Sequence, residues 1–305
     1  MTRVLLLRAF AKVNYALEVL GVRPDGYHEL STIFQSISLY DGVRIEQAER
    51  DFKLVVEPEG VEIGPPEENT VYRAHKLLAE FVGDRLPARI RLRKSIPAGA
   101  GLGGGSSDAA ATLVGLNALF GLGLSGAELK KVGLKVGADV PFCIEGGTAL
   151  GRGVGEVLRP LPAPPPHHLV VAKPAEGAET ASIYRAYDEC PGESKHSVEP
   201  VVEALQAGSL YELAKALGND LAPVTRGFVP EVQKLEEELL QARALGVAMS
   251  GTGTAAYGVF GYMAEARVAE SSLQAPFVKV CEPVPRGVVM LERWKSGSAT
   301  GRARS

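Results

Sequence analysis

The chain is predicted to be a mixed α and β protein of two domains, and three observations lead to this prediction. Its 305 residues exceed the roughly 100–200 residues that one domain usually holds. Segments with strand-like alternation and segments with helix-like periodicity follow one another along the chain. A proline-rich segment, PLPAPPP at 160–166, separates the two halves. We therefore expect domains at 1–160 and 161–294 and a disordered tail at 295–305.

The composition excludes several classes of partner. The 33 basic and 36 acidic side chains give a formal charge of −3, which is too balanced for a surface that binds nucleic acid or a membrane. Three scattered cysteines form neither a disulfide framework nor a zinc motif. The uncharged stretch 244–264 is too rich in glycine for a membrane span. With no signal peptide in the first residues, we expect a cytoplasmic protein.

The first half contains two well-patterned strands. In residues 10–18, FAKVNYALE, the apolar residues alternate with Lys12 and Asn14, so both polar side chains project from the same face. Residues 88–96 alternate again and lead into the glycine-rich segment PAGAGLGGGSS. A helix is expected to follow, with Ser106, Ser107 and Asp108 as its N-cap and first turn.

The glycine-rich segment 97–107 is predicted to bind phosphate. Glycines leave backbone N–H groups accessible, and the following helix adds about half a positive charge at its N-terminus. A Walker A loop is excluded because Gly105, not Lys, precedes Ser106. A dinucleotide fingerprint would place its acidic residue near Glu128, within an expected helix, and a flexible linker would not join a patterned strand to a helix. These two alternatives stay open but are less favoured.

The remaining elements follow the same reasoning. Residues 127–137 are expected to form a short helix, and 137–147 a turn leading into a strand, with Asp139 at the turn. His167 and His168 are interpreted as surface loop residues. A strand at 169–173 and helices at 198–208, 210–218 and 229–246 should follow, the last ending at Gly246. Two strands around a glycine turn should form 244–264.

The motifs together resemble the GHMP kinase superfamily. PAGAGLGGGSSDAAA resembles its second motif, and MSGTGTAAYGVF resembles its third. The segments AKVNYALEVLGVRPDGYHELSTIFQSISLYD and GADVPFC resemble the 4-diphosphocytidyl-2-C-methyl-D-erythritol kinase family, although Tyr15 stands where an aliphatic residue is expected. The resemblance implies an α+β GHMP kinase fold. Its N-terminal domain would be similar to ribosomal protein S5 domain 2, and its C-terminal domain would be ferredoxin-like.

The resemblance also implies an activity: an ATP-dependent small-molecule kinase of non-mevalonate isoprenoid synthesis that phosphorylates the 2-hydroxyl of 4-diphosphocytidyl-2-C-methyl-D-erythritol. Asp139 would be the base that activates the hydroxyl, and Lys12 would orient it and stabilise negative charge. Lys12 stands on a strand patterned for burial, so it needs a carboxylate partner, and Asp139 is the candidate. ATP chemistry implies Mg²⁺, with Ser106 or Ser107 as a contact, while the metal ligands stay open.

By the same resemblance, the binding residues fall into two groups. Those for ATP are Pro97, Ala98, Gly99, Ala100, Gly101, Leu102, Gly103, Gly104, Gly105, Ser106 and Ser107, with Asn69 near the adenine. Those for the cytidine diphosphate substrate are Asn14, Tyr27, His28, Val154, Thr180 and Tyr184.

Two other functions stay open. Another GHMP kinase, acting on homoserine or mevalonate, would give the DGYHEL segment no role. A silent ligand sensor would not need the Lys12 and Asp139 pair. The oligomeric state cannot be read from the sequence.

Overall fold

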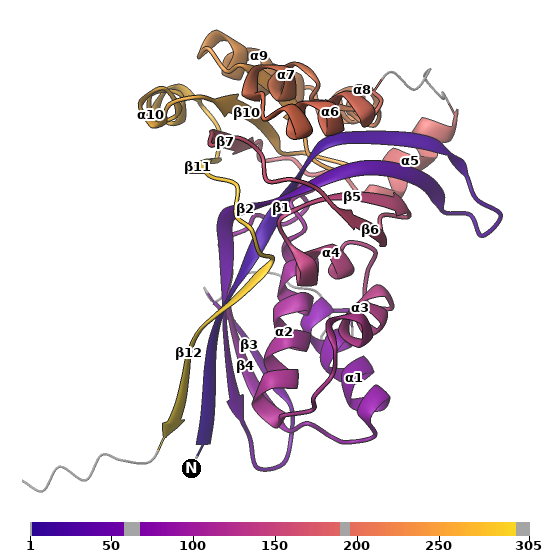
Figure 1. Cartoon of the computed structure of the whole chain (residues 1–305), viewed down its shortest axis with the longest axis vertical. Coiled ribbons are helices and arrows are strands. Elements are labelled where there is room, and N and C mark those ends of the chain that lie inside the picture. Colours follow the sequence, from indigo (N-terminus) through magenta and orange to yellow (C-terminus); the bar gives the residue numbers. More distant parts are fainter. Residues whose placement is uncertain (1, 58–67, 190–195, 297–305) are drawn as a thin grey trace, which may run out of the picture.

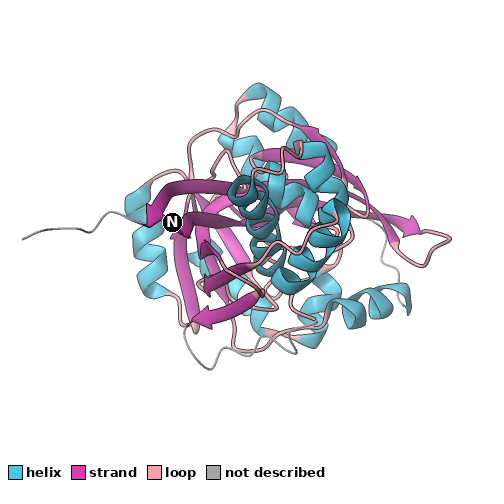
Figure 2. Cartoon of the chain, turned by 90° about the horizontal axis from the view of Figure 1, so that it is seen from below, coloured by secondary structure: helices cyan, strands magenta, loops and turns pink. Residues whose placement is uncertain are grey.

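The computed structural model describes residues 2–57, 68–189 and 196–296, which form two sheets with helices packed around them. In Figure 1 the first sheet runs the length of the molecule, and α1 to α4 lie on one side of its lower part. The second sheet lies at the top, among α6 to α10. Strands and helices occur throughout the molecule when it is seen from below (Figure 2), so the predicted α+β class is confirmed.

The elements of the first half are β1 (Thr2–Val22), β2 (His28–Gln47), β3 (Lys53–Glu57), α1 (Thr70–Val82), β4 (Ala88–Arg93), α2 (Gly104–Phe120), α3 (Gly126–Leu134), α4 (Val140–Glu145), β5 (Thr148–Gly153) and β6 (Val157–Pro160). Those of the second half are β7 (His168–Lys173), α5 (Thr180–Glu189), α6 (Glu199–Ala207), α7 (Leu210–Lys215), β8 (Gly218–Asn219), α8 (Ala222–Phe228), α9 (Glu231–Gln241), β9 (Gly246–Met249), β10 (Ala256–Phe260), α10 (Met263–Ser272), β11 (Phe277–Cys281) and β12 (Val288–Ser296).

The last strand of the chain belongs to the first sheet. That sheet has the order β12-β1-β2-β4-β3, with β5 and β6 continuing from β2 and the short β8 pairing with β1. The second sheet has the order β11-β7-β10-β9 and is antiparallel throughout. The chain thus leaves the first sheet after β6, builds the second, and returns as β12. The predicted domain boundary at 160–161 stays a prediction. The structure shows in addition that β12, from the end of the second half, belongs to the first sheet.

Strand β1 connects three hydrophobic cores. Its apolar residues from Leu5 to Ala9 pack under α2, those from Ala11 to Tyr15 face the second sheet, and Leu17 and Val19 contact the region of α5 and α8. The polar residues predicted to share the other face, Lys12 and Asn14, lie at the middle of this strand. The strand therefore holds two charged or polar side chains at the junction of both sheets.

The second sheet is buried on both faces, which explains the continuous apolar run of β7. Val170 and Ala172 contact α9 and α10, whereas Leu169 and Val171 face the core that contains β1. Alternate residues of β7 thus pack into two different hydrophobic cores. One of these cores also takes in Ala100 and Leu102 of the glycine-rich segment, so the predicted phosphate loop rests on packed side chains.

Several predicted elements are confirmed and others are corrected. Strands β9 and β10 around a glycine turn match the prediction for 244–264. The helix predicted to end at Gly246 ends at Gln241, because Gly246 already pairs in β9. The segment after Asp139 forms the helix α4 before the chain enters β5. The tail prediction falls largely on residues 297–305, which lie outside the described residues.

The interpretation of His167 as a surface residue is wrong. It is buried, and its Nδ1 lies 2.8 Å from the carbonyl oxygen of Pro165, so Nδ1 carries the proton. Its Nε2 then accepts from the Tyr15 hydroxyl at 3.1 Å. This bond explains why a tyrosine is tolerated at position 15, where an aliphatic residue was expected. Burial lowers the pKa of His167. His168 lies in β7 and is partly buried.

Within the described residues, no helix is both long and apolar enough to cross a bilayer.

The start of β12 approaches α4 so closely that only glycine fits there. A Cβ at Gly287 would lie 1.9 Å from the carbonyl oxygen of Cys143, a backbone atom that cannot rotate away. Gly287 also accepts a hydrogen bond from the N–H of Phe10. We expect Gly287→Ala to lower the free energy of unfolding by about 1–3 kcal/mol, measured by urea denaturation. The control is Gly126→Ala, where a Cβ meets open space. Equal unfolding midpoints for the two variants would show that the backbone does not approach Gly287 this closely.

Candidate active site

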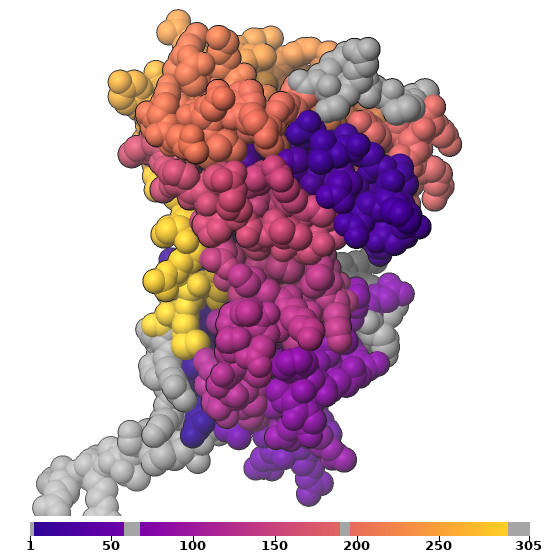
Figure 3. All heavy atoms as spheres, turned by 45° about the vertical axis from the view of Figure 1, so that its right-hand side comes forward, coloured from indigo at the N-terminus to yellow at the C-terminus, as the bar shows by residue number. Residues whose placement is uncertain are grey.

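A cavity of about 1060 Å³ lies where the two sheets meet. It is lined by segments far apart in sequence: β1 and β2, the hairpin between them, the glycine-rich segment, the turn before α4, α5 and the turn between β9 and β10. In Figure 3 the indigo end of the β1–β2 hairpin lies against segments from the second half of the chain. The predicted site residues that line the cavity are Lys12, Asn14, Tyr27, His28, Gly99, Gly101, Gly103, Ser106, Asp139, Val154, Thr180 and Tyr184.

The predicted partnership between Lys12 and Asp139 is present. The Nζ atom of Lys12 lies 3.2 Å from Oδ2 of Asp139, with the lysine side chain 4% and the aspartate side chain 30% exposed. Asp139 occupies the N-cap position of α4 but caps no backbone N–H there, so its carboxylate remains available to the cavity. A buried ammonium thus faces a carboxylate that a ligand can reach.

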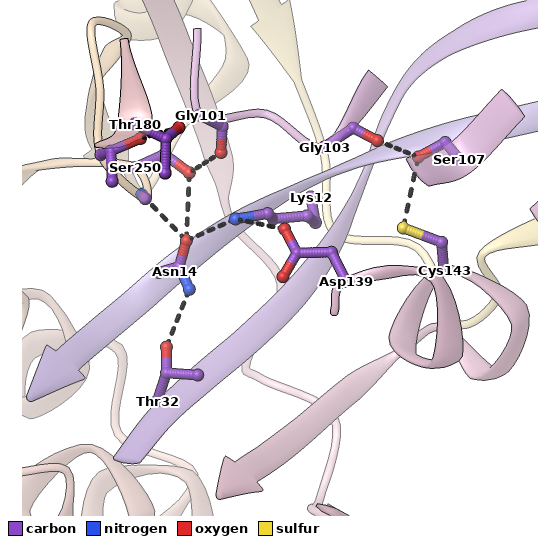
Figure 4. Close-up of polar contacts among 12 residues, drawn as sticks. Lys12, Asn14, Thr32, Gly101, Gly103, Ser107, Asp139, Cys143, Thr180 and Ser250 are labelled. Atoms are coloured by element: carbon purple, nitrogen blue, oxygen red, sulfur yellow. Dashed lines mark hydrogen bonds and ion pairs between the residues drawn. The ribbon is translucent and has the colours of Figure 1, made fainter. Parts of the chain in front are cut away.

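Asn14 connects this ion pair to three neighbouring segments (Figure 4). Its Oδ1 accepts hydrogen bonds from Lys12 Nζ at 2.8 Å and from the N–H of Gly251 at 3.0 Å. Its Nδ2 donates to the Thr32 hydroxyl at 2.8 Å. Ser250, next to Gly251, in turn donates to the carbonyl oxygen of Gly101 at 2.9 Å. Asn14 therefore sets the position of Lys12 relative to both glycine turns.

The glycine-rich segment has two faces. Gly99, Gly101 and Gly103 have φ values of 60°, 71° and 69°, which side chains rarely adopt, and they line the cavity. The intervening Ala100 and Leu102 are buried in the core. The N–H groups of Gly101 and Gly103 donate no hydrogen bond within the described part of the chain. They can therefore be offered to an anion.

The expected N-cap of α2 is wrong. The helix begins at Gly104, its N-cap is Gly103, and no side chain caps it. Ser107 lies within the first turn, is fully buried, and donates to the carbonyl oxygen of Phe10 at 2.6 Å. Within residues 2–57, 68–189 and 196–296, no backbone or side-chain acceptor satisfies the N–H groups that precede Ser107 in this helix, which is the arrangement of an anion-binding helix terminus. Of the two serines, Ser106 is the one that lines the cavity.

The far end of the cavity is aromatic. The rings of His28 and Tyr184 stack with centroids 4.4 Å apart and an interplanar angle of 25°. Nε2 of His28 also lies 2.8 Å from Oδ1 of Asp188, one helical turn beyond Tyr184 on α5. Tyr27 is 66% exposed at the mouth of the cavity. Because His28 and Tyr184 are in direct contact, a planar ligand has to stack on an outer face of this pair or separate the two rings.

Three further predicted residues have different surroundings. Thr180 begins α5, and its hydroxyl lies 3.0 Å from that of Thr252 in the turn after β9. Val154 lines the cavity beyond β5. Asn69 is the N-cap of α1 and is outside the cavity lining, although the neighbouring Thr70 hydroxyl donates to the carbonyl oxygen of Gly105. The binding role of Asn69 stays a prediction, as do those of the others.

Two titratable groups at the site are held in their neutral forms. Burial, with the charge of Asp139 adding to it, raises the pKa of the Cys143 thiol to about 12. The same two causes raise the pKa of Tyr184. Cys143 also lies 3.5 Å from the Ser107 hydroxyl. Neither group is a nucleophile at neutral pH, which leaves Lys12 and Asp139 as the charged pair at this part of the cavity.

Reasoning from sequence missed residues that hold the site together. Asn219 donates to the carbonyl oxygens of Met249 and Gly251, at 3.0 and 2.7 Å, and so fixes the turn after β9. Asp188 holds His28. Asp188 follows Tyr184 by four residues, so the helical period would have placed it on the same face of α5. Nothing comparable marks Asn219, because Met249 and Gly251 lie about thirty residues away in sequence.

Comparisons with known proteins identify the family to which the chain belongs. Two family models match the chain, GHMP kinases N terminal domain at residues 69–147 and GHMP kinases C terminal at residues 201–279. A homoserine kinase structure from Cytophaga hutchinsonii, 17% identical, superimposes with a TM-score of 0.74 over 94% of this chain and 97% of that one. At that identity it shows the fold alone.

Closer relatives identify the branch of the superfamily. A 4-diphosphocytidyl-2-C-methyl-D-erythritol kinase of Pelotomaculum thermopropionicum is 45% identical over 260 residues, covering 85% of this chain and 90% of that protein. A crystal structure of 4-(cytidine 5'-diphospho)-2C-methyl-D-erythritol kinase has a TM-score of 0.77 and 36% identity, covering 93% of this chain and 99% of that one. The chain therefore belongs to the 4-diphosphocytidyl-2-C-methyl-D-erythritol kinase family of GHMP kinases.

Proposed function

We propose that this kinase transfers the γ-phosphate of ATP to the 2-hydroxyl of 4-diphosphocytidyl-2-C-methyl-D-erythritol. The observation that carries the proposal is the Lys12–Asp139 ion pair at 3.2 Å, placed between the glycine-rich segment and the aromatic end of one cavity. Phosphoryl transfer needs an anion cradle, a group that accepts the hydroxyl proton, and a cation that stabilises developing charge. The cavity offers candidates for all three.

In the proposed mechanism, Asp139 accepts the proton of the substrate hydroxyl while the oxygen attacks the γ-phosphorus. The ammonium of Lys12 stabilises the negative charge that develops on the oxygen and the transferred group. Asn14 and Asp139 hold the ammonium in place, so it need not reorganise during the reaction. Transfer is direct, without a covalent enzyme intermediate.

The glycine-rich segment is the proposed cradle for the ATP phosphates. Its support is the pair of undonated N–H groups at Gly101 and Gly103 and the uncapped start of α2. The charge of the chain is nearly balanced, so phosphate affinity must come from such local donors. Asn69 and Thr70 at the start of α1 lie beside this segment, which is consistent with a nearby adenine pocket.

We also propose that Mg²⁺ accompanies ATP. Among the described residues there is no group of three or more His, Cys, Asp or Glu side chains that could hold a metal ion. Mg²⁺ bound through phosphates needs only one or two protein ligands, and Ser106 lines the cavity beside the glycine-rich segment. The Ser106 hydroxyl would contact the ion, and the buried Ser107 hydroxyl, which already donates to Phe10, would not. The ion would supply charge neutralisation of the phosphates.

The aromatic end of the cavity is the proposed site for the cytidine diphosphate group. Tyr27, His28 and Tyr184 supply ring faces and His28 supplies a polar edge, which suits a planar base with hydrogen-bonding groups. Val154 and Thr180 would complete the wall of this pocket. This half of the cavity would make the enzyme select the proposed substrate over the substrates of other GHMP kinases.

The substrate assignment is tested by measuring ADP release with candidate alcohols. We expect turnover with 4-diphosphocytidyl-2-C-methyl-D-erythritol and a kcat/KM at least 100-fold lower for the same sugar alcohol without the cytidine diphosphate group. Homoserine and mevalonate serve as controls and should not be phosphorylated. Equal rates with and without the nucleotide group would refute the assignment of the aromatic end.

Replacing Asp139 by Asn tests the proposed base. The amide keeps the size of the side chain but cannot accept the proton, so we expect kcat to fall by about 10²–10⁴-fold with ATP affinity nearly unchanged. The matched control is Glu179→Gln, a carboxylate in the same cavity that bonds the Ser182 hydroxyl instead of Lys12. Its kcat should stay within about twofold of the parent enzyme. An active Asp139→Asn variant would exclude the role.

The glycine-rich segment is tested by a pair of alanine substitutions. Gly99 and Gly101 both have positive φ, so either alanine strains the backbone by about 1–2 kcal/mol. Only at Gly101 would the new Cβ also collide, 1.9 Å from the carbonyl oxygen of Ser250, whereas at Gly99 it meets open space. We expect the KM for ATP to rise at least about tenfold more in Gly101→Ala than in Gly99→Ala. Steady-state kinetics at saturating second substrate measures this, and equal KM values would argue against the close contact.

A further inference from the structure

A buried charge cluster lies directly behind the glycine-rich segment, outside the cavity lining. At its centre is Asp41 of β2, whose side chain is fully buried. One carboxylate oxygen of Asp41 accepts the backbone N–H groups of Ser95 and Ile96, at 2.5 and 2.9 Å. The other accepts from Nζ of Lys94 at 2.5 Å. A single carboxylate therefore holds three consecutive residues that connect β4 to the glycine-rich segment.

Lys94 extends this cluster to the far side of the segment. Its Nζ also donates to Oδ2 of Asp108, at 2.7 Å, within the first turns of α2. The ammonium lies close beneath the start of the helix, since a Cβ at Gly104 would be 3.5 Å from it. Residues 94–96 precede residues 97–103, and α2 follows them. Asp41 therefore holds the first end of the glycine-rich segment directly and the second end through Lys94 and Asp108.

We propose that Asp41 is a positioning residue for the nucleotide: its carboxylate fixes both ends of the glycine-rich segment, so that the free N–H groups between them point at the ATP phosphates. This inference rests on the proposed role of that segment as the phosphate cradle. Pre-set donors bind an anion without paying for the ordering of a flexible loop. Removing the anchor should therefore weaken ATP binding and leave the cytidine end of the cavity unaffected.

The two carboxylates that share Lys94 have unequal roles. Asp41 uses both oxygens, on three donors, whereas Oδ1 of Asp108 is buried without a hydrogen-bond partner in the described part of the chain. Burial, together with the neighbouring charge of Asp41, raises the pKa of Asp108 well above its ordinary range despite the opposing charge of Lys94. Asparagine at 108 keeps an oxygen for the one donor that Asp108 holds, Nζ of Lys94. Asparagine at 41 loses one of the two oxygens on which three donors depend.

The experiment compares Asp41→Asn with Asp108→Asn in the full-length enzyme. For each, the KM of ATP, the KM of the cytidine diphosphate substrate, and the shift in Tm on adding ADP are measured. We expect Asp41→Asn to raise the KM of ATP about tenfold and to lose most of the ADP-induced Tm shift, with the other KM within twofold of the parent. Asp108→Asn should stay within about twofold in all three measurements.

A further variant covers the case in which Asp41→Asn does not fold because the partly buried Lys94 is left without one of its two carboxylate partners. Asp41→Asn combined with Lys94→Met and Asp108→Asn removes all three ionisable groups of the cluster, a change that buried ion pairs often tolerate. It should fold and still show the raised KM for ATP. A folded variant lacking Asp41 with the parental KM for ATP, equal rises in both KM values, or an equal effect of Asp108→Asn would overturn the inference. If the parent enzyme itself showed no ADP-induced shift and no turnover, the proposed function would fail instead.

Discussion

The structure depends on burying one ammonium group, that of Lys12. An ammonium that is only 4% exposed must be compensated, because an unpaired buried charge costs several kcal/mol. The compensation comes from Asn14 on the same strand and from Asp139 at the start of α4. Gly103 is part of the same constraint, since a Cβ there would lie 3.0 Å from Cγ of Lys12. Charge burial thus brings a strand, a helix start and a glycine turn to one point.

Irregularities in β1 make this convergence possible. The register of β1 on β2 shifts between Phe10 and Lys12 and again between Asn14 and Ala16. Bulges increase the local twist of a strand and redirect side chains. Here they bracket the two residues that reach the cavity, while the regular stretches on either side remain ordinary sheet. The long strand therefore serves as a continuous support for the core and, over three residues, as part of the site.

Local sequence patterns predict those features of the site that depend only on neighbouring residues, such as the face of a strand on which a side chain lies. The alternation in residues 10–18 placed Lys12 and Asn14 on one face, and the glycines of 97–107 indicated exposed backbone donors. The ends of helices were less predictable: Ser106 and Ser107 have good N-cap chemistry, but α2 begins two residues earlier, where a free N-terminus remains open to a ligand. Contacts between distant segments, such as Asn219 with Gly251, leave no periodic trace in one sequence. Their discovery required the fold.

The pairing of β12 with β1 also bears on how the molecule is made. A ribosome releases β1 before the second sheet and β12 after it, so the edge of β1 that pairs with β12 waits while the second sheet is made. Exposed edges invite pairing with other chains. The order of translation thus leaves this edge open to other chains until the returning strand docks.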